Sequence, residues 1–190
     1  MDKKVLKVLK ELEKTRHEFW NISKETGTFL NVLIRISNIK KILEIGTSNG
    51  VSAIYMAEAL KSKGAPQIHQ IYTIESNYKL RFPLAKANFA KTSLAPYVTQ
   101  ILGHAPEVIP KNPKFFDLFF LDATKYEHAD YLKAIIPRMK KDSIIITDNA
   151  TSHKEALKPY FRELKKYKNL KNQLIKLGSG LLITVRDPTA

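Results

Sequence analysis

A short apolar run that ends at a glycine loop constrains the fold of this chain more than any other stretch. Residues 41–50 read KILEIGTSNG, and the apolar letters near their start are typical of a strand buried on both faces. Gly46 and Gly50 follow in a loop, and residues 51–61 then carry apolar side chains at helical spacing. The stretch predicts a strand, a glycine turn and a helix, which lets backbone N–H groups approach a ligand closely. A tight turn without any ligand has the same pattern, so the pattern alone does not establish that a ligand binds here.

The length and the amino-acid composition set broad limits. We expect one domain over residues 1–190, with N-terminal helices over 1–37 that cover a substrate or dimer face and a core over 38–190. The chain has no cysteine, which excludes disulfides and thiolate metal sites. No stretch approaches the roughly 20 apolar residues of a membrane span. We therefore expect a soluble, cytoplasmic protein with no membrane partner.

The charge is strongly basic. Lys and Arg outnumber Asp and Glu by 32 to 18, which gives a net charge of +14. Such an excess attracts polyanions, with nucleic acid first among them. Solvated helix faces rich in lysine give similar totals without any partner, so the charge alone leaves both interpretations open.

Strands and helices alternate along most of the chain. We predict helices over 2–19, 26–36, 51–61, 78–91, 128–139 and 154–167, and strands over 41–45, 70–74, 97–102, 115–121, 143–147, 172–177 and 181–185. This spacing indicates an α/β fold with a parallel sheet and helices on both faces. The last two strands are separated only by residues 178–180, a link short enough to require antiparallel pairing. The prediction is a seven-stranded, mostly parallel sheet that ends in an antiparallel hairpin.

Three acidic residues each follow a predicted strand. Glu75, Asp122 and Asp148 stand where their strands end, and ligands of open α/β sheets bind beyond the carboxyl ends of the strands. Any one of them could be a turn residue or a helix N-cap. Three acids along one edge of the sheet indicate a ligand-binding site.

Glu75 suggests a nucleoside cofactor. An acid after the second strand can accept hydrogen bonds from both hydroxyls of a ribose. The loop has the spacing G-x-x-x-G at Gly46 and Gly50, without the third glycine of a dinucleotide fingerprint. A nicotinamide dehydrogenase is therefore disfavoured, and S-adenosylmethionine, which has no pyrophosphate, is the candidate.

Asp122 and Asp148 suggest a metal ion. If their strands are neighbours, about 4.8 Å apart, the two carboxylates can share one cation, with Asn149 adding a third oxygen. An all-oxygen set suits Mg²⁺, with Ca²⁺ or Mn²⁺ as alternatives. Zinc is disfavoured because the histidines show no metal-ligand spacing.

Lys125 follows Asp122 by three positions. A lysine beside a divalent cation and a sulfonium is favoured in its neutral form, because like charges disfavour protonation, and it could then accept a proton. The alternative is an ordinary exposed lysine.

The motifs from 25 to 185 resemble those of the metal-dependent class I O-methyltransferases typified by catechol and caffeoyl-CoA O-methyltransferases. Similar stretches are ETGTFL (25–30), ILEIGTSNGVS (42–52), IYTIE (71–75), GHA (103–105), LDATK (121–125), DN (148–149) and GSGLLITV (178–185). The resemblance implies a Rossmann-like methyltransferase fold. It implies cofactor contacts at Glu44, Gly46, Thr47, Ser52, Glu75, His104, Ala105 and Asp122. It also implies a metal held by Asp122, Asp148 and Asn149, with Lys125 and Asp122 in catalysis.

Several departures from the family pattern concern the substrate. Thr124 stands where many relatives have a second acid, and His104 and Ser179 replace residues that are often acidic. The N-terminus is short, so we expect the helices that enclose the substrate pocket in some members to be missing. These changes are compatible with the metal and methyl chemistry, but they put a catechol or phenylpropanoid substrate in doubt.

The leading hypothesis is Mg²⁺-dependent transfer of a methyl group from S-adenosylmethionine to a hydroxyl of a small molecule with vicinal oxygens. One alternative is 5-hydroxyuridine in tRNA, which some family members methylate and which also offers adjacent oxygens. Another is a cofactor-binding protein without catalysis that acts through its basic surface. By analogy with relatives we also expect a homodimer.

Overall fold

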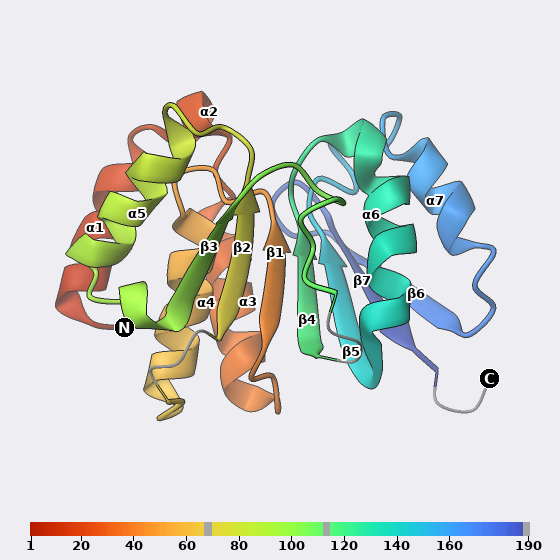
Figure 1. Cartoon of the computed structure of the whole chain (residues 1–190), viewed down its shortest axis with the longest axis horizontal. Helices are drawn as coiled ribbons and strands as arrows, with labels where there is room; N and C mark the ends of the chain where they lie inside the picture. The colour runs from red at the N-terminus through yellow and green to blue at the C-terminus, as the bar shows by residue number, and fades with distance from the viewer. Residues whose placement is uncertain (67–69, 112–114, 188–190) are drawn as a thin grey trace.

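One mixed sheet of seven strands organises the structure (Figure 1). The computed structural model describes residues 1–66, 70–111 and 115–187. The strands are β1 (Ile42–Ile45), β2 (Ile71–Glu75), β3 (Val98–Leu102), β4 (Phe116–Leu121), β5 (Met139–Thr147), β6 (Leu170–Ile175) and β7 (Leu181–Arg186). Their order is β3-β2-β1-β4-β5-β7-β6. The first five strands are parallel and β7 is antiparallel to both neighbours, which confirms the predicted fold class.

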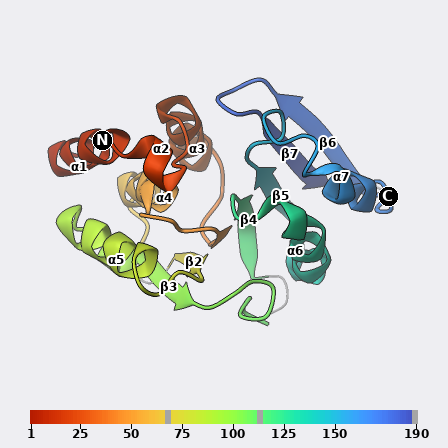
Figure 2. The ribbon, with the colours of Figure 1, turned by 90° about the horizontal axis from the view of Figure 1, so that it is seen from above.

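Helices cover both faces of the sheet (Figure 2). They are α1 (Lys3–Glu13), α2 (Arg16–Phe19), α3 (Lys24–Ile36), α4 (Val51–Ser62), α5 (Arg81–Lys91), α6 (His128–Ile135) and α7 (Lys158–Leu164), with short 3-10 turns η1 (Ala95–Tyr97), η2 (Lys125–Glu127) and η3 (Ile136–Arg138). Buried side chains of α1, α3, α4 and α5 belong to one apolar cluster, and those of α6 and α7 belong to the other. Within the described residues, no helix combines the length and the apolar character needed to cross a membrane.

The central position of β4 follows from its sequence, FDLFFL. Leu118 and Phe120 pack into the cluster on one face, while Phe119 and Leu121 pack into the other. All of these side chains are fully buried, as expected for a parallel strand with helices on both sides. The apolar sequence of β4 thus agrees with its position in the middle of the sheet.

The predicted N-terminal helix over 2–19 is wrong in its length. The apolar stripe of α1 ends at Leu12, and the helix closes at Lys14 with a tightened last turn. The separate helix α2 follows and ends at Trp20, whose backbone is left-handed with φ of 53°. The chain therefore turns here, and α2 reaches the carboxyl edge of the sheet, where it lines the cavity described below.

Prolines and a capping side chain explain why the other helix boundaries differ from the predicted ones. The predicted helix over 128–139 ends at Ile135, because Pro137 follows and Met139 already belongs to β5. The predicted helix over 154–167 is only α7, which begins at Lys158 with Pro159 in its first turn. The predicted helix over 78–91 begins at Arg81, after the Asn77 side chain accepts hydrogen bonds from the first backbone amides.

Strand register brings the ends of β1, β2, β4 and β5 to one edge. Ile45 pairs with both Ile74 and Leu121, and Leu121 pairs with Thr147. The next residue on each strand therefore stands at the same level. At Gly46 the fit is so close that an added Cβ would lie 2.2 Å from the Asp122 carbonyl oxygen, and φ is +103°.

Replacing Gly46 by alanine should destabilise the fold more than the matched change at Gly64. Gly64 also has positive φ, +71°, but an added Cβ there would meet no atom within 4 Å. Both variants lose roughly 1 kcal/mol to left-handed strain. Gly46→Ala should lose at least about 2 kcal/mol more because backbone atoms must move. Urea unfolding of the two variants measures this difference, and equal losses would contradict the close approach at Asp122.

Candidate active site

A cavity of about 580 Å³ opens at the carboxyl edge of the sheet. Loops after β1, β2, β3, β4 and β5 line it, together with α2. Of the residues predicted from the sequence, it is lined by Gly46, Glu75, His104, Ala105, Asp122, Lys125, Asp148 and Asn149. Residues more than 100 positions apart in the chain thus face one space, as the alternation of strands and acids predicted.

The Glu75 carboxylate is held at the cavity wall by backbone amides. Its Oε2 accepts from the Ser48 N–H at 2.8 Å, and its Oε1 accepts from the Asn77 N–H at 2.9 Å. Each carboxylate oxygen has a further lone pair, so Glu75 can still accept hydrogen bonds from ligand hydroxyls. The orientation of this acid is therefore set before any ligand arrives.

Glu44, Thr47 and Ser52 do not line the cavity, in contrast to the contact predicted for them. Their side chains point into the protein beneath the glycine loop and are almost completely buried. Ser52 Oγ and Thr73 Oγ1 each donate to one oxygen of Glu44, and Thr47 Oγ1 is hydrogen-bonded to Thr73 Oγ1. This network ties the loop to β2 and α4 and supports the cavity floor from below.

Burial also changes the ionisation of Glu44. Desolvation raises the pKa of its carboxyl to about 8, although the hydrogen bonds from Ser52 and Thr73 oppose the shift. The group is therefore mostly protonated at neutral pH. A neutral carboxyl is less costly in this fully enclosed position than a carboxylate would be.

Asp122 and Lys125 form an ion pair inside the cavity. The Lys125 Nζ lies 2.7 Å from Asp122 Oδ1, and the two side chains are only 13% and 14% exposed. Burial raises the pKa of Asp122 to about 7; the positive charge of Lys125 opposes this shift and the negative charge of Asp148 adds to it. Asp148, the third acid that the sequence placed at this edge, is thus close enough to repel Asp122.

The C-terminal hairpin fixes Asp148. Ser179, in the loop between β6 and β7, donates its hydroxyl to Asp148 Oδ1 at 2.7 Å. The backbone N–H groups of Thr151 and Ser152 donate in turn to the Ser179 carbonyl at 3.1 and 3.0 Å. Asn149 takes a left-handed backbone conformation, with φ of 62°, which turns the chain away from the sheet. Ser179 therefore has a structural role that its departure from the family pattern did not reveal.

The donor set at Asp122, Asp148 and Asn149 fits a hard divalent cation. In the three described stretches, no group of three or more His, Cys, Asp or Glu side chains is arranged around a common metal position. Any cation here would depend on two carboxylates and one amide, which are oxygen donors of the kind that Mg²⁺ prefers. The repulsion between Asp122 and Asp148 is what a bound cation would relieve.

His104, in the loop after β3, lines the cavity within a polar cluster. Its Nε2 lies 3.1 Å from Glu127 Oε1, and its Nδ1 lies 2.9 Å from the Ala105 carbonyl oxygen. The Tyr131 hydroxyl donates to the other oxygen of Glu127. The imidazole is thus held between two acceptors at a position where the resemblance implies a cofactor contact.

The sequence did not identify four residues that surround the cavity. Trp20 and Tyr126 are 75% and 77% exposed, and the Arg81 guanidinium lies 5.0 Å from the centre of the Trp20 ring. His153 also lines the cavity. A single aromatic residue in a basic, helical stretch carries no periodic signal, so only the turn at the end of α2 shows that Trp20 reaches the site.

The sheet order and the ligand-sized cavity at its carboxyl edge define the class of protein: a Rossmann-like methyltransferase fold. The chain belongs to the O-methyltransferase family, whose model matches residues 1–185. This confirms the resemblance seen in the motifs.

The relatives include enzymes of the two types that the motifs suggested. Caffeoyl-CoA O-methyltransferase 1 of Arabidopsis thaliana is 31% identical over 170 residues, which cover 84% of this chain and 63% of that protein. Catechol O-methyltransferase of Niastella koreensis is 29% identical over 133 residues, 68% of this chain and 58% of that protein. The SAH-bound methyltransferase PaMTH1 of Podospora anserina has the same fold, with a TM-score of 0.84 and 22% identity. The match covers 98% of this chain and 88% of that protein.

Replacing Glu44 by glutamine should change how stability depends on pH. The folded protein holds the Glu44 proton more tightly than the unfolded chain does, so the stability from this group falls as pH rises from about 4.5 to about 8. Glutamine cannot ionise. Between pH 5 and pH 8, the free energy of unfolding of the variant should improve relative to the unsubstituted protein by roughly 1 to 4 kcal/mol. Urea unfolding at both pH values measures it, and a constant difference would contradict the raised pKa.

Proposed function

We propose that this protein transfers a methyl group from S-adenosylmethionine to a hydroxyl oxygen of a small acceptor with vicinal oxygens, with Mg²⁺ as the metal. One observation carries the proposal: the Lys125–Asp122 pair shares a cavity with Asp148 and Asn149. A potential proton acceptor therefore adjoins a set of metal-type oxygen donors. The family and its catechol and caffeoyl-CoA relatives support methyl transfer to oxygen.

The cofactor would bind along the part of the cavity formed by the ends of β1, β2 and β3. Glu75, already oriented by two amides, would accept from the ribose hydroxyls, and Gly46 allows the cofactor to approach the backbone. His104 and Ala105 would face the adenine. Glu44, Thr47 and Ser52 would act indirectly, by holding the glycine loop in place.

The residues of the cavity can perform the reaction between bound partners. When bound, S-adenosylmethionine supplies the methyl group that the acceptor oxygen takes, and a divalent cation lowers the pKa of the acceptor hydroxyl. Asp122, Asp148 and Asn149 would hold that cation. Lys125, in the neutral form that an adjacent cation and a sulfonium would favour, would take the hydroxyl proton at Nζ. The enclosure of Lys125 and Asp122 keeps water from competing for the same proton, and holding both reactants in one cavity supplies much of the acceleration.

Methyl transfer should be observed with a catechol acceptor and should stop when divalent metal is removed. The purified protein is incubated with labelled S-adenosylmethionine, either with a panel of catechols or with bulk tRNA, and each reaction is repeated with a chelator. We expect label in at least one catechol, loss of transfer with the chelator, and recovery on addition of Mg²⁺. Transfer that is unaffected by a chelator would contradict the metal; cofactor binding without transfer to any acceptor would favour the non-catalytic alternative.

Replacing Lys125 should lower turnover without weakening cofactor binding. Lys125→Ala removes the proton acceptor, and Lys125→Arg keeps the positive charge beside Asp122 but cannot give up its own proton. Both should lower kcat by about 100-fold or more. Lys133→Ala is the matched control, because Lys133 forms a similar pair with Asp130 at 2.9 Å on the exposed face of α6. Calorimetry should show that the three variants and the unsubstituted protein bind the cofactor with affinities within about threefold of each other. Full activity of Lys125→Arg would refute proton removal by Lys125.

RNA is the second candidate acceptor, and two observations favour it. The chain has a net charge of +14, and Trp20 and Tyr126 expose their rings at the cavity. Bases stack on exposed aromatic rings, and cations such as Arg81 beside them attract the phosphate backbone. The tRNA arm of the experiment above decides between the two acceptors. Labelled tRNA, together with affinity that falls steeply as salt is added, would establish RNA as the acceptor.

A further inference from the structure

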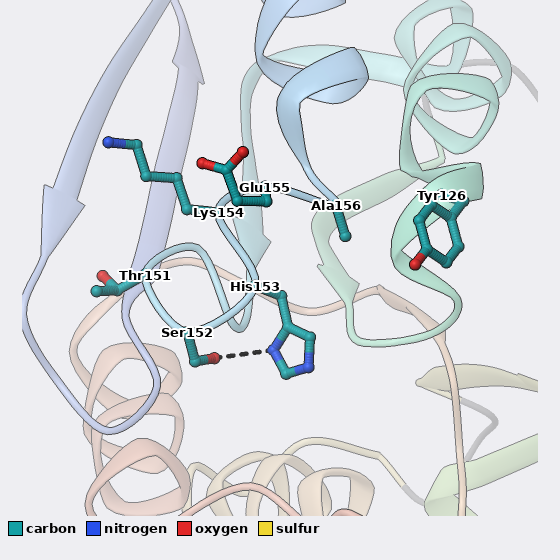
Figure 3. A pocket seen from close by; sticks show the side chains of 7 residues that line it. All are labelled: Tyr126, Thr151, Ser152, His153, Lys154, Glu155 and Ala156. Atoms are coloured by element: carbon teal, nitrogen blue, oxygen red, sulfur yellow. Dashed lines mark hydrogen bonds between the residues drawn. The ribbon is translucent and has the colours of Figure 1, made fainter.

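A second hollow of about 510 Å³ adjoins the reaction cavity (Figure 3). Its wall is formed by Tyr126 and by residues 151–156, the turns between β5 and α7. Tyr126, His153 and Ala156 line both spaces. The two spaces therefore meet at these residues, and a molecule in the reaction cavity could extend past His153 into the second one. We call this second space the side groove.

The His153 ring is oriented by its own loop. Its Nδ1 lies 2.9 Å from Ser152 Oγ, and this hydroxyl accepts from the Asn149 Nδ2 at 3.4 Å. The His153 backbone N–H donates to the Asn149 carbonyl at 2.9 Å. Because Ser152 accepts from Asn149, its own proton can point to Nδ1 of the imidazole. That direction leaves the ring proton on Nε2.

His153 Nε2 is the atom that remains available to a ligand. Within the stretches that the structure describes, no hydrogen bond or ion pair is made by this nitrogen. The Lys154 side chain extends away from the ring, so it does not compete for the same position (Figure 3). Tyr126, at 77% exposed, offers a flat apolar face along the same junction. The junction thus combines one directed N–H donor with one aromatic surface.

We propose that His153 is a specificity-determining residue that donates its Nε2–H to an oxygen carried by a substituent of the acceptor. The assignment rests on the proposed function. With the vicinal hydroxyls at Asp122, Asp148 and Lys125, a ring substituent can point toward the side groove, where a carboxylate or carbonyl oxygen meets His153. The favoured acceptors are therefore dihydroxyaromatic acids, and an unsubstituted catechol leaves the donor without a partner.

The test compares 3,4-dihydroxybenzoate with catechol. A hydrogen bond to a charged oxygen favours the acid, so the unsubstituted protein should use it with a kcat/KM about 10-fold higher. His153→Phe, which keeps a ring but has no donor, should abolish this preference mainly by raising KM for the acid. Its kcat/KM for catechol should stay within about twofold. His153→Gln, which keeps an N–H at a similar reach, should restore much of the preference.

A binding measurement and a matched control separate a direct contact from a general effect of charge. Calorimetric titration of 3,4-dihydroxybenzoate into protein loaded with S-adenosylhomocysteine and Mg²⁺, where no turnover occurs, should show about 10-fold weaker binding to His153→Phe. Lys154→Gln removes a positive charge at the next position, and its affinity should be unchanged. An equal loss in Lys154→Gln would contradict the assignment.

The outcomes distinguish this inference from the proposed function. Turnover of both acceptors with no preference for the acid overturns the role of His153 and leaves methyl transfer intact. An equal loss of kcat/KM for the two acceptors in His153→Phe has the same meaning. No turnover of either acceptor by the unsubstituted protein overturns the small-molecule function and this assignment with it.

Discussion

The hydrogen bonds that join β1, β4 and β5 in register determine where the reactive groups lie. The ladder continues one step past the strands: the Asp122 N–H donates to the Ile45 carbonyl and the Asp148 N–H donates to the Leu121 carbonyl, both at 3.0 Å. Each aspartate is therefore fixed through its own backbone, by a sheet whose central strand is packed on both faces. Side chains that repel one another are held together because the core beneath them cannot rearrange without losing its burial.

Burial and charge act together at this edge of the sheet. Glu44 lies beneath the glycine loop as a neutral, hydrogen-bonded carboxyl, while Asp122 lines the cavity beside a lysine and a second acid. The two groups differ because one is satisfied within the protein and the other faces a cavity. Glu44 stiffens the loop, and Asp122 and Asp148 are left to interact with ligands.

The sequence predicted the sheet and the acidic residues that line the cavity, because both depend on local patterns. The largely apolar stretch 115–121 is typical of a buried strand, and acids that follow parallel strands gather at one edge of the sheet. It did not predict that Glu44, Thr47 and Ser52 face inward, since a motif gives order along the chain and not the direction of a side chain. It also missed the contribution of Ser179, which depends on a hydrogen bond across 31 positions.

The contact between Ser179 and Asp148 has a consequence for the dynamics of the far edge of the sheet. The β6–β7 hairpin includes an edge strand, yet its loop is bonded to an acid of the candidate metal site. Local opening of the hairpin must break that bond and free the carboxylate, so opening and ligand binding are thermodynamically linked. Occupation of the site would then slow amide hydrogen exchange in a hairpin whose strands do not line the cavity.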